Sequence, residues 1–356
     1  MRDSTAIDQE RLDAFSMRAI TDLAAGYTGV MVSLGNKLGL YRAMANAGPL
    51  SARELAARTG CAQRHVGEWL NNQAAGGYIC YHTASETYEL SAEQAQVLAD
   101  EDSPYFISGA WDIPASLWLD EHKLLDAFST GGGLAWGEHN ERLACGVAAF
   151  YRNGYRASLV QQWLPALDGV VARLEQGIDV ADVGCGHGHS TLLMADAFRK
   201  SRLHGFDTHA PSVGEAQRHA DQAGAGSRVS FSVAGASDYP DRQYGLICFF
   251  DTLHDLGDPV AAARHAAQVL APGGTVMLVE PFANDLAEDN FSTVGQLYYA
   301  GSCLICCGHA ISEGGKLVLG AQAGPARLAE VFRRAGFTHF RQAAQTPFNL
   351  VFEIRR

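Results

Sequence analysis

The feature that most constrains this chain is the stretch VADVGCGHGHST at residues 180–191, where three interleaved glycines follow an apolar run and an aspartate. Glycine permits a tight turn and lets a ligand approach the main chain closely. Where such a turn joins a strand to a helix, the free N–H groups at the helix N-terminus attract carboxylates and phosphates. The stretch therefore predicts a strand, a turn that holds a nucleotide-like cofactor, and a helix that begins at His189.

Alternating strand and helix patterns surround this turn and continue to the end of the chain, as a parallel sheet with crossover helices requires. The last two predicted strands are joined by so short a loop that they must be antiparallel, because a parallel return needs about a dozen residues or more. The pattern predicts an α/β fold with a Rossmann-like seven-stranded sheet, mostly parallel with the last strand antiparallel. We expect strands at 178–183, 202–206, 229–233, 244–250, 274–280, 338–342 and 348–355, and helices near 189–199, 211–223, 258–270 and 324–336.

The first hundred residues are mainly helical in pattern and predict a winged helix. Ser51 and Glu54 form a capping box at the start of one helix, Gly60 ends it, and a second helix spans 63–72. The strand-like run YICYH and a returning strand complete a helix–turn–helix with a hairpin. We expect a winged-helix dimerisation domain at 1–100, an aromatic-rich helical connector that lines the substrate pocket at 101–168, and a cofactor-binding domain at 169–356.

The composition limits the classes of partner. The chain of 356 residues is long enough for two domains. A formal net charge of −12 argues against a nucleic-acid partner, because binding to phosphates depends on Lys and Arg. Since no apolar run reaches about 20 residues and no signal pattern opens the chain, we expect neither a membrane span nor secretion. The eight scattered cysteines indicate reduced thiols, and we expect a cytoplasmic protein.

The spacing of the glycines selects among cofactors. A nicotinamide or flavin dinucleotide requires G-x-G-x-x-G, whereas this chain has G-C-G-H-G followed by His189. Asp207 ends the next predicted strand, where an acidic residue can hold ribose hydroxyls. The shorter spacing is typical of S-adenosylmethionine proteins and disfavours a dehydrogenase.

With this loop, Asp207 and the antiparallel last pair, the C-terminal part resembles a class I S-adenosylmethionine-dependent methyltransferase. The whole chain is similar to plant-type O-methyltransferases and to bacterial relatives that carry an N-terminal winged-helix dimerisation domain. The resemblance implies a homodimer that transfers a methyl group to a hydroxyl of a small aromatic or phenolic metabolite. Some bacterial proteins of this layout are classed as transcriptional regulators. An S-adenosylmethionine-sensing regulator is therefore the alternative, although the predicted helix pair carries three arginines against two glutamates, a net charge of only +1.

The resemblance also implies roles for single residues. The glycine loop would contact the methionine part of the cofactor, and Asp207 the ribose. Gly235 and Ala236 occupy the family's adenine loop, where the usual acidic residue is missing or displaced to Asp238, so we expect backbone groups to recognise adenine. Upstream, Gly154 replaces the family's methionine. The implied cofactor-binding residues are Ser158, Gly184, Cys185, Gly186, Gly188, Asp207, Thr208, Gly235, Ala236 and Phe250.

His254 is the candidate general base. A phenol has a pKa of about 10 and reacts poorly until its proton is removed, which a histidine with a pKa near neutrality can do. The His254–Asp255 pair resembles the family motif in which this histidine is the base, and Glu280 matches the glutamate that orients it. Two alternatives stay open: His254 caps the following helix, or Asp251 and Asp255 belong to a magnesium site.

The segment 282–322 is long for a connection between a strand and a helix, and we expect it to form part of the acceptor pocket. Its cysteines and histidine lack the second ligand pair of a structural zinc site. We therefore favour buried thiols that line a pocket over a metal site for Cys303, Cys306, Cys307 and His309. Oxygen, nitrogen and sulfur acceptors all fit this pattern.

Overall fold

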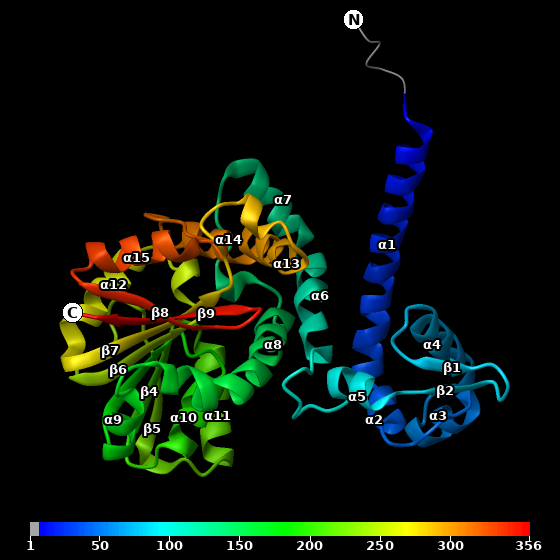
Figure 1. The fold of residues 1–356 in the computed structure, drawn as a ribbon, viewed down its shortest axis with the longest axis horizontal. Coiled ribbons are helices and arrows are strands. Elements are labelled where there is room, and N and C mark those ends of the chain that lie inside the picture. Colours follow the sequence, from blue (N-terminus) through cyan, green and yellow to red (C-terminus); the bar gives the residue numbers. More distant parts are fainter. Residues whose placement is uncertain (1–6) are drawn as a thin grey trace, which may run out of the picture. The chain divides into compact units, whose positions relative to one another are not determined.

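The computed structural model describes residues 7–356, which form two compact units. The first ends at Ala115 and the second runs from Ser116 to Arg356, so the boundary falls within helix α6 (Asp112–Leu119). Figure 1 shows the elements of each unit. The functional boundaries at residues 100 and 168 stay a prediction.

The first unit is mainly helical and contains one short hairpin. Its elements are α1 (Gln9–Lys37), α2 (Leu40–Met44), α3 (Ala52–Thr59), α4 (Gln63–Ala75), β1 (Cys80–His82), β2 (Thr87–Glu89), α5 (Ala92–Leu98) and η1 (Ser108–Trp111). The predicted capping box is present, because the Glu54 N–H donates to the Ser51 hydroxyl at 3.3 Å and the Ser51 N–H donates to the Glu54 carboxylate at 2.8 Å. Strands β1 and β2 pair antiparallel, which completes the expected helix–turn–helix with a hairpin.

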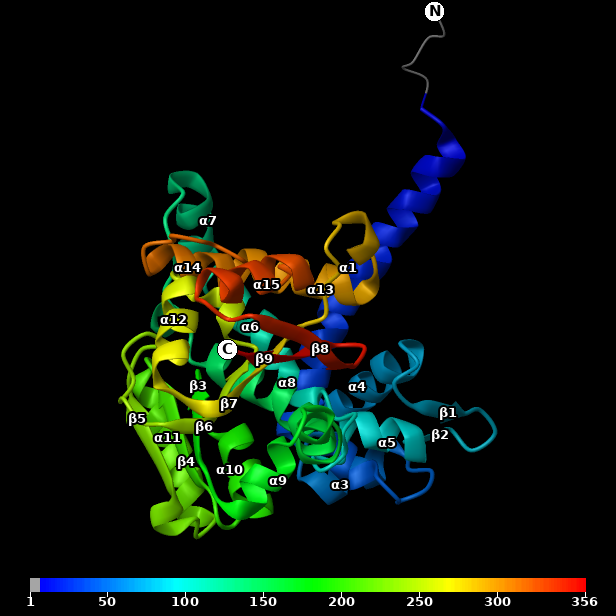
Figure 2. The same cartoon turned by 60° about the vertical axis from the view of Figure 1, so that its left-hand side comes forward.

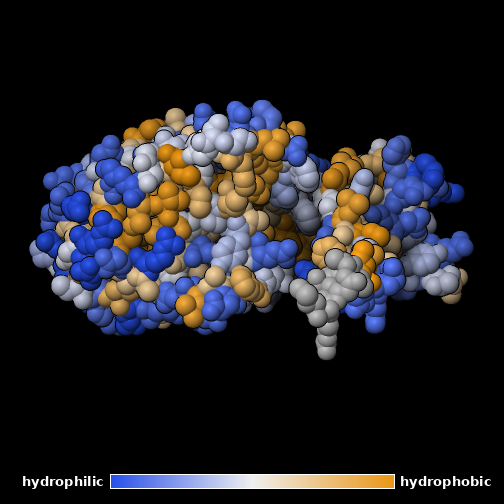
Figure 3. Space-filling view, turned by 90° about the horizontal axis from the view of Figure 1, so that it is seen from above, coloured by the Kyte–Doolittle hydropathy of each residue, from blue (hydrophilic) through white to orange (hydrophobic). Residues whose placement is uncertain are grey.

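Helix α1 presents apolar side chains to solvent over most of its length. Phe15, Leu23 and Tyr27 are 68%, 63% and 69% exposed. Figure 3 colours apolar residues orange and shows a group of them at the surface of this unit. Only towards its C-terminal end does the helix enter the core of the unit, where Val32 is buried and Gly35 lies against Trp69. Extended apolar surfaces of this kind usually mark contact sites.

The second unit contains a seven-stranded sheet. In sheet order its strands are β5 (Val229–Val233), β4 (Arg202–Asp207), β3 (Asp179–Val183), β6 (Tyr244–Phe250), β7 (Leu270–Pro281), β9 (Asn349–Arg355) and β8 (His339–Gln345). The first five strands in this order are parallel to one another. The last strand of the chain, β9, runs antiparallel to both β7 and β8. The predicted Rossmann-like sheet with an antiparallel last strand is confirmed.

Helices cover both faces of this sheet, as Figures 1 and 2 show. They are α12 (Pro259–Val269) and α15 (Gly324–Arg334) on one face, and α9 (Val170–Gln176), α10 (His189–Ala197) and α11 (Ala210–Gln222) on the other. Along β6, Ile247 and Phe249 pack in the first layer while Leu246 and Cys248 pack in the second. Strands this apolar on both faces are typical of a parallel sheet between two helix layers. Within residues 7–356, no helix combines the length and the apolarity needed to span a bilayer.

Further helices come before and after the main strands. They are α7 (Glu121–Thr130), η2 (Trp136–Glu138), α8 (Arg142–Ser158) and the π-helical turn η3 (Leu159–Trp163), and, between β7 and α15, α13 (Thr293–Gly301), η8 (Ser302–Cys306) and α14 (Cys307–Ser312). The Leu134 N–H donates to the Gly308 carbonyl at 3.0 Å. The two groups of helices, far apart in the sequence, therefore lie side by side.

The register of the sheet brings four chain segments to one edge. Val183 pairs with both Phe206 and Phe249. The residues that end or follow the strands consequently lie together at the carboxyl edge, where ligands bind in open α/β sheets. They are Gly184 after β3, Asp207 at the end of β4, Asp251 after β6 and Glu280 near the end of β7.

Candidate cofactor and active site

The glycine loop joins β3 to α10 through three left-handed residues. Gly184, Gly186 and Gly188 have φ values of 76°, 50° and 77°, a conformation that strains a residue with a side chain. A Cβ at Gly184 would lie 2.2 Å from Thr252, and a Cβ at Gly188 would lie 2.6 Å from Phe231. Close approach of neighbouring segments therefore requires glycine at both positions.

Gly186 is different, because a Cβ placed there would meet no protein atom within 4 Å. The residue lines an open cavity, and its missing side chain leaves the main chain accessible. The fit to a ligand is direct: a group such as the methionine part of S-adenosylmethionine can lie against this backbone. Nearby, the Ser190 and Thr191 hydroxyls donate to the buried Asp182 carboxylate at 2.7 and 2.5 Å, which fixes the start of α10 on β3.

Asp207 is held by a main-chain donor on each oxygen. The N–H groups of Gly186 and His209 donate to its carboxylate at 2.9 and 2.8 Å. Each carboxylate oxygen keeps a further lone pair, and the residue lines the cavity. The carboxylate is thus fixed in position and still able to accept hydrogen bonds from ribose hydroxyls.

Asp238, the displaced acidic residue of the adenine loop, shapes the loop after β5. The Gly235 N–H donates to the Asp238 carboxylate at 2.6 Å. Asp238 is exposed, whereas Gly235 and Ala236 line the cavity. Asp238 therefore organises the loop from outside and leaves backbone groups at the cavity wall. Recognition of adenine by those groups stays a prediction.

The cavity has a volume of about 450 Å³, in the range of small-molecule sites. Two predicted cofactor residues are not among the described residues that line it: Gly188 is the N-cap of α10, and Ser158 is buried where α8 becomes η3. Aromatic side chains from the predicted connector, Trp136, Tyr151 and Tyr155, also line it. The predicted residues that do line the cavity are Gly184, Cys185, Gly186, Asp207, Thr208, Gly235, Ala236 and Phe250.

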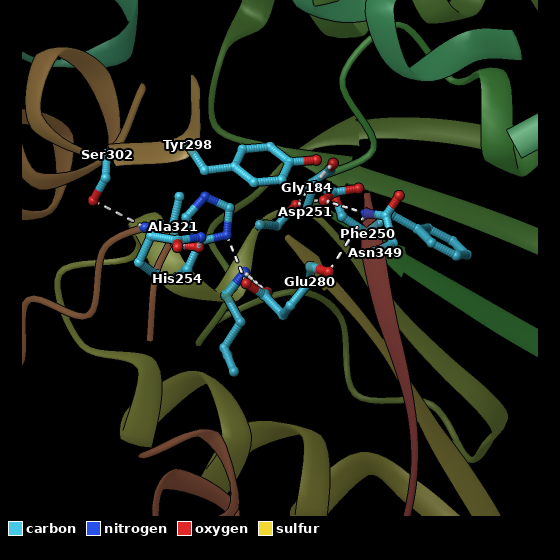
Figure 4. Close-up of polar contacts among 12 residues, drawn as sticks. Gly184, Phe250, Asp251, His254, Glu280, Tyr298, Ser302, Ala321 and Asn349 are labelled. Carbon is cyan, nitrogen blue, oxygen red and sulfur yellow. Dashed lines mark hydrogen bonds and ion pairs between the residues drawn. The ribbon is translucent and has the colours of Figure 1, made fainter. Parts of the chain in front are cut away.

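His254 and Glu280 form a buried pair. His254 lies in the turn η6 (Leu253–Asp255), and its Nδ1 is 2.6 Å from Glu280 Oε2. The other oxygen of Glu280 accepts the Leu253 N–H at 3.0 Å. One carboxylate thus holds both the ring and the turn that carries it, as Figure 4 shows. The two residues are only 4% and 1% exposed, and neither is among the described residues that line the cavity.

The surroundings of His254 set its charge. Burial alone lowers its pKa, but the Glu280 carboxylate and the adjacent Cys306 thiol outweigh burial and raise the pKa of His254 well above its ordinary value. The ring is therefore protonated at neutral pH in the free protein. It has to lose this proton before it can accept one from a substrate.

The alternative that His254 caps the next helix is wrong. Asp258 is the N-cap of α12, because its carboxylate accepts the Ala261 N–H at 2.9 Å. Across residues 7–356, no group of three His, Cys, Asp or Glu side chains is arranged to hold a metal ion. Of the thiols predicted to be buried, Cys306 is buried but Cys303 is exposed. The prediction of a buried cysteine cluster is wrong for Cys303, since these residues lie on different faces of one helical segment.

Asp251 is the site residue that the sequence pattern suggested only as a metal ligand. It follows β6 with a φ of 49°, which is uncommon for a residue other than glycine. Its carboxylate lines the cavity and accepts the Tyr155 hydroxyl at 2.9 Å and the Asn349 amide at 2.8 Å. Burial, and next the charge of Glu280, raise the pKa of Asp251 to about 8. The sequence could have indicated Asp251 as a site residue, because it directly follows a buried strand.

A chain of polar contacts joins α14 to the cavity rim. His309 Nδ1 accepts a hydrogen bond from the main-chain N–H of Trp136 at 3.2 Å, so the ring proton is assigned to Nε2. Nε2 lies 3.5 Å from the Glu313 carboxylate. Glu313 also accepts the Gly257 N–H at 2.9 Å. Asp255 lines the cavity close by, and burial raises its pKa to about 6. These contacts hold the segment between β7 and α15 at the rim.

Two sequence families match the chain. The methyltransferase domain family matches residues 153–339, which are 187 of the 356 residues. The Rv2258c-like winged HTH domain family matches residues 26–100.

Known proteins give partial matches in sequence and full-length matches in structure. The chain is 33% identical over 107 residues to the 27-O-demethylrifamycin SV methyltransferase of Amycolatopsis mediterranei, a match that covers 30% of this chain and 39% of that protein. The fold is similar to that of human N-acetylserotonin methyltransferase in complex with SAM, with a TM-score of 0.70, 16% identity and 99% of each chain covered. It is also similar to the O-methyltransferase NcsB1 from neocarzinostatin biosynthesis, solved with S-adenosylmethionine and 2-hydroxy-5-methyl naphthoic acid, with a TM-score of 0.63, 19% identity and 95% and 98% of the two chains covered.

Proposed function

Because the chain belongs to the methyltransferase domain family, whose cofactor is S-adenosylmethionine, we propose that it methylates a hydroxyl of a small aromatic or phenolic metabolite. The observation that carries this proposal is the buried His254–Glu280 pair beside the cavity of the glycine loop. In the chain, His254 stands between Thr252 and Asp255, both of which line that cavity. A base-and-orienter pair next to a cofactor cavity suits proton removal from a hydroxyl.

The cofactor, when bound, supplies a methyl group carried on a sulfonium. The protein's part is to hold and orient it. In the proposed assignment, the backbone at Gly184 and Gly186 holds the methionine part, Asp207 accepts the ribose hydroxyls, and the loop of Gly235 and Ala236 flanks adenine. The fixed positions of these groups support the assignment, because positioning contributes much of the acceleration in such displacements.

We assign the general base to His254 and its orientation to Glu280. The 2.6 Å contact at Nδ1 leaves Nε2 for the acceptor hydroxyl. Since the Cys306 thiol contacts the ring, an acceptor has to displace that thiol in order to reach it. The ring must also be neutral when the acceptor binds, so the raised pKa of His254 makes the reaction favour alkaline pH.

The aromatic acceptor is inferred from the cavity wall. Three aromatic side chains, Trp136, Tyr151 and Tyr155, line the cavity, and the small residues Ala144 and Ala148 line it as well. The naphthoic acid in the NcsB1 structure is a ligand of comparable shape. A flat phenol suits such a wall, because aromatic rings stack on or meet each other edge to face.

The proposal is tested with radiolabelled S-adenosylmethionine and a panel of small phenols, naphthols and matched anilines. We expect label to enter the phenols and not the anilines. Exclusive labelling of the anilines, or of no acceptor in a panel that the protein binds, would contradict it.

We further propose that the protein is a homodimer. Its interface would bury the apolar face of α1, which carries Phe15, Leu23 and Tyr27. The exposed fractions of Phe15, Leu23 and Tyr27 support this, since burying apolar side chains drives association. In light scattering after gel filtration, we expect a dimer for the native chain and a monomer for Leu23→Glu. Thr21→Glu, on the opposite face of α1, is the matched control and should stay dimeric. A native chain that is monomeric at micromolar concentration would exclude this interface.

A sensing regulator is the second candidate, favoured by the winged HTH match at 26–100. Against it, Arg64 on α4 forms an ion pair with Glu68 on the same helix, which leaves little positive charge for phosphates. A gel-shift assay with genomic fragments, with and without S-adenosylmethionine, separates the candidates. Salt-sensitive binding to one duplex would favour the regulator.

A further inference from the structure

Asp251 lies where the glycine loop meets the end of β6. Its chain neighbours Phe250 and Thr252 line the cavity, and Thr252 is the side chain that prevents a Cβ at Gly184. Figure 4 shows Gly184, Phe250 and Asp251 together at this point. The residue keeps a left-handed backbone conformation to present its carboxylate there, and strain of this kind is retained mostly at functional positions.

The charges along the cavity distinguish Asp251 from the other acids. Among the described residues that line the cavity there is no lysine or arginine, and the acidic ones are Asp207, Asp251, Asp255, Asp258 and Glu313. Asp207 is fixed by two N–H donors of the loop and is assigned to the ribose hydroxyls, and Asp258 caps α12 and pairs with Lys316. Glu313 is bonded at the rim to Gly257. Asp251 is the carboxylate next to Gly184, and thus next to the place assigned to the methionine part of the cofactor.

We propose that Asp251 is the counter-charge against which the cationic methionine end of the cofactor binds, and that cofactor binding ionises this carboxyl group. The inference rests on the proposed function, because it assumes that S-adenosylmethionine occupies the cavity. The sulfonium and the α-ammonium both carry positive charge, and a carboxylate close by is the group that complements them.

The free protein keeps this carboxyl group largely protonated. Burial, and next the charge of Glu280, raise the pKa of Asp251 to about 8, so this carboxyl group is mostly protonated at pH 7. A cation beside it lowers the pKa and releases the proton. The groups that face Asp251 are Tyr151 and Tyr155 on α8, Glu280 on β7, His254 on η6, Tyr298 on α13 and Asn349 on β9.

The test is calorimetry of S-adenosylmethionine binding at pH 7 in two buffers of different ionisation enthalpy, which counts the protons released. The variant is Asp251→Asn, whose amide can still accept from Asn349 and donate to the Tyr155 oxygen. The matched control is Asp255→Asn, another carboxyl group of the cavity but with a pKa of about 6. Thermal melting verifies that each variant is folded.

We expect the native protein to release close to one proton more than Asp251→Asn, and the difference to disappear above about pH 9. We also expect Asp251→Asn to bind about tenfold more weakly, as is typical for loss of a charge-assisted contact, and Asp255→Asn to release protons as the native chain does. The cofactor's own amino group titrates in all three proteins and cancels in the comparison. Equal release from the native protein and Asp251→Asn would overturn the inference alone, whereas no binding to the native protein would overturn the proposed function.

Discussion

The two halves of the candidate site differ in how the chain builds them. At the glycine loop, main-chain groups and one fixed carboxylate face an open cavity. At His254, a side-chain pair is buried, and the ring carries its charge inside the protein. From this difference we expect cofactor binding to depend on the backbone of the loop and on the carboxylates beside it, whereas the proposed chemistry depends on the buried His254–Glu280 pair. Substitutions should therefore affect one half without the other.

The largest expected effect is on turnover alone. His254→Ala should lower kcat by roughly 10²- to 10⁴-fold, because it removes the proposed general base. The affinity for S-adenosylmethionine should stay within about twofold, since the ring is not among the described residues that line the cavity. Steady-state kinetics and calorimetry on one preparation check this. Unchanged turnover would show that His254 is not the general base.

Gly184→Ala should have the converse effect and weaken the binding of S-adenosylmethionine. A Cβ there would lie 2.2 Å from Thr252, at a φ of 76°, and backbone strain of this kind costs about 1–3 kcal/mol before the overlap is counted. We expect roughly a 100-fold or greater loss of affinity for S-adenosylmethionine by calorimetry. Gly214→Ala is the control, because that position in α11 has open space and normal helical backbone. It should bind normally and be slightly more stable.

Glu280→Gln should further distinguish the two halves of the site, because it should shift the pH profile of kcat. Glu280 raises the pKa of His254, and only the neutral ring is a base, so the native rate should rise with pH through an alkaline limb. Glutamine removes the negative charge and lowers the pKa of His254, which shifts the limb to lower pH while the maximal rate falls. The measurement is kcat between pH 6 and 10, on the scale of ordinary His and Tyr pKa values of about 6.5 and 10. If the alkaline limb of kcat lies at the same pH in Glu280→Gln as in the native protein, Glu280 does not act through His254.

The smallest expected effect concerns the adenine loop. Asp238→Ala removes the acceptor of the Gly235 N–H, a single exposed hydrogen bond worth about 0.5–1 kcal/mol. Affinity for S-adenosylmethionine should fall about two- to fivefold in calorimetry. A loss as large as that expected for Gly184→Ala would mean that Asp238 contacts the cofactor directly.

The fold, and the position of the glycine loop and Asp207 at the cavity, were largely predictable from the sequence. The glycine loop, Asp207 and the antiparallel last pair are local features, because each follows from residues close together in the chain. The predicted start of α10 at His189 is confirmed, and β7 differs mainly by starting at Leu270.

The rest of the site depends on contacts between distant residues. The burial of His254 by Cys306, the hydrogen bonds from Tyr155 and Asn349 to Asp251, and the rim formed with Trp136 join segments about 50 to 170 residues apart. No pattern of neighbouring residues in the sequence indicates contacts between positions so far apart in the chain. Ser158 shows the same effect, since the change from α8 to η3 buries it away from the cavity.

The most direct test of the central claim, that the glycine-loop cavity binds S-adenosylmethionine, is calorimetry with S-adenosylhomocysteine on the native protein and on Asp207→Ala. We expect one site per chain in the native protein and a loss of at least about tenfold in affinity for the variant, because a fixed charged acceptor is removed. Absence of binding to the folded native protein, or equal affinity for both, would contradict it.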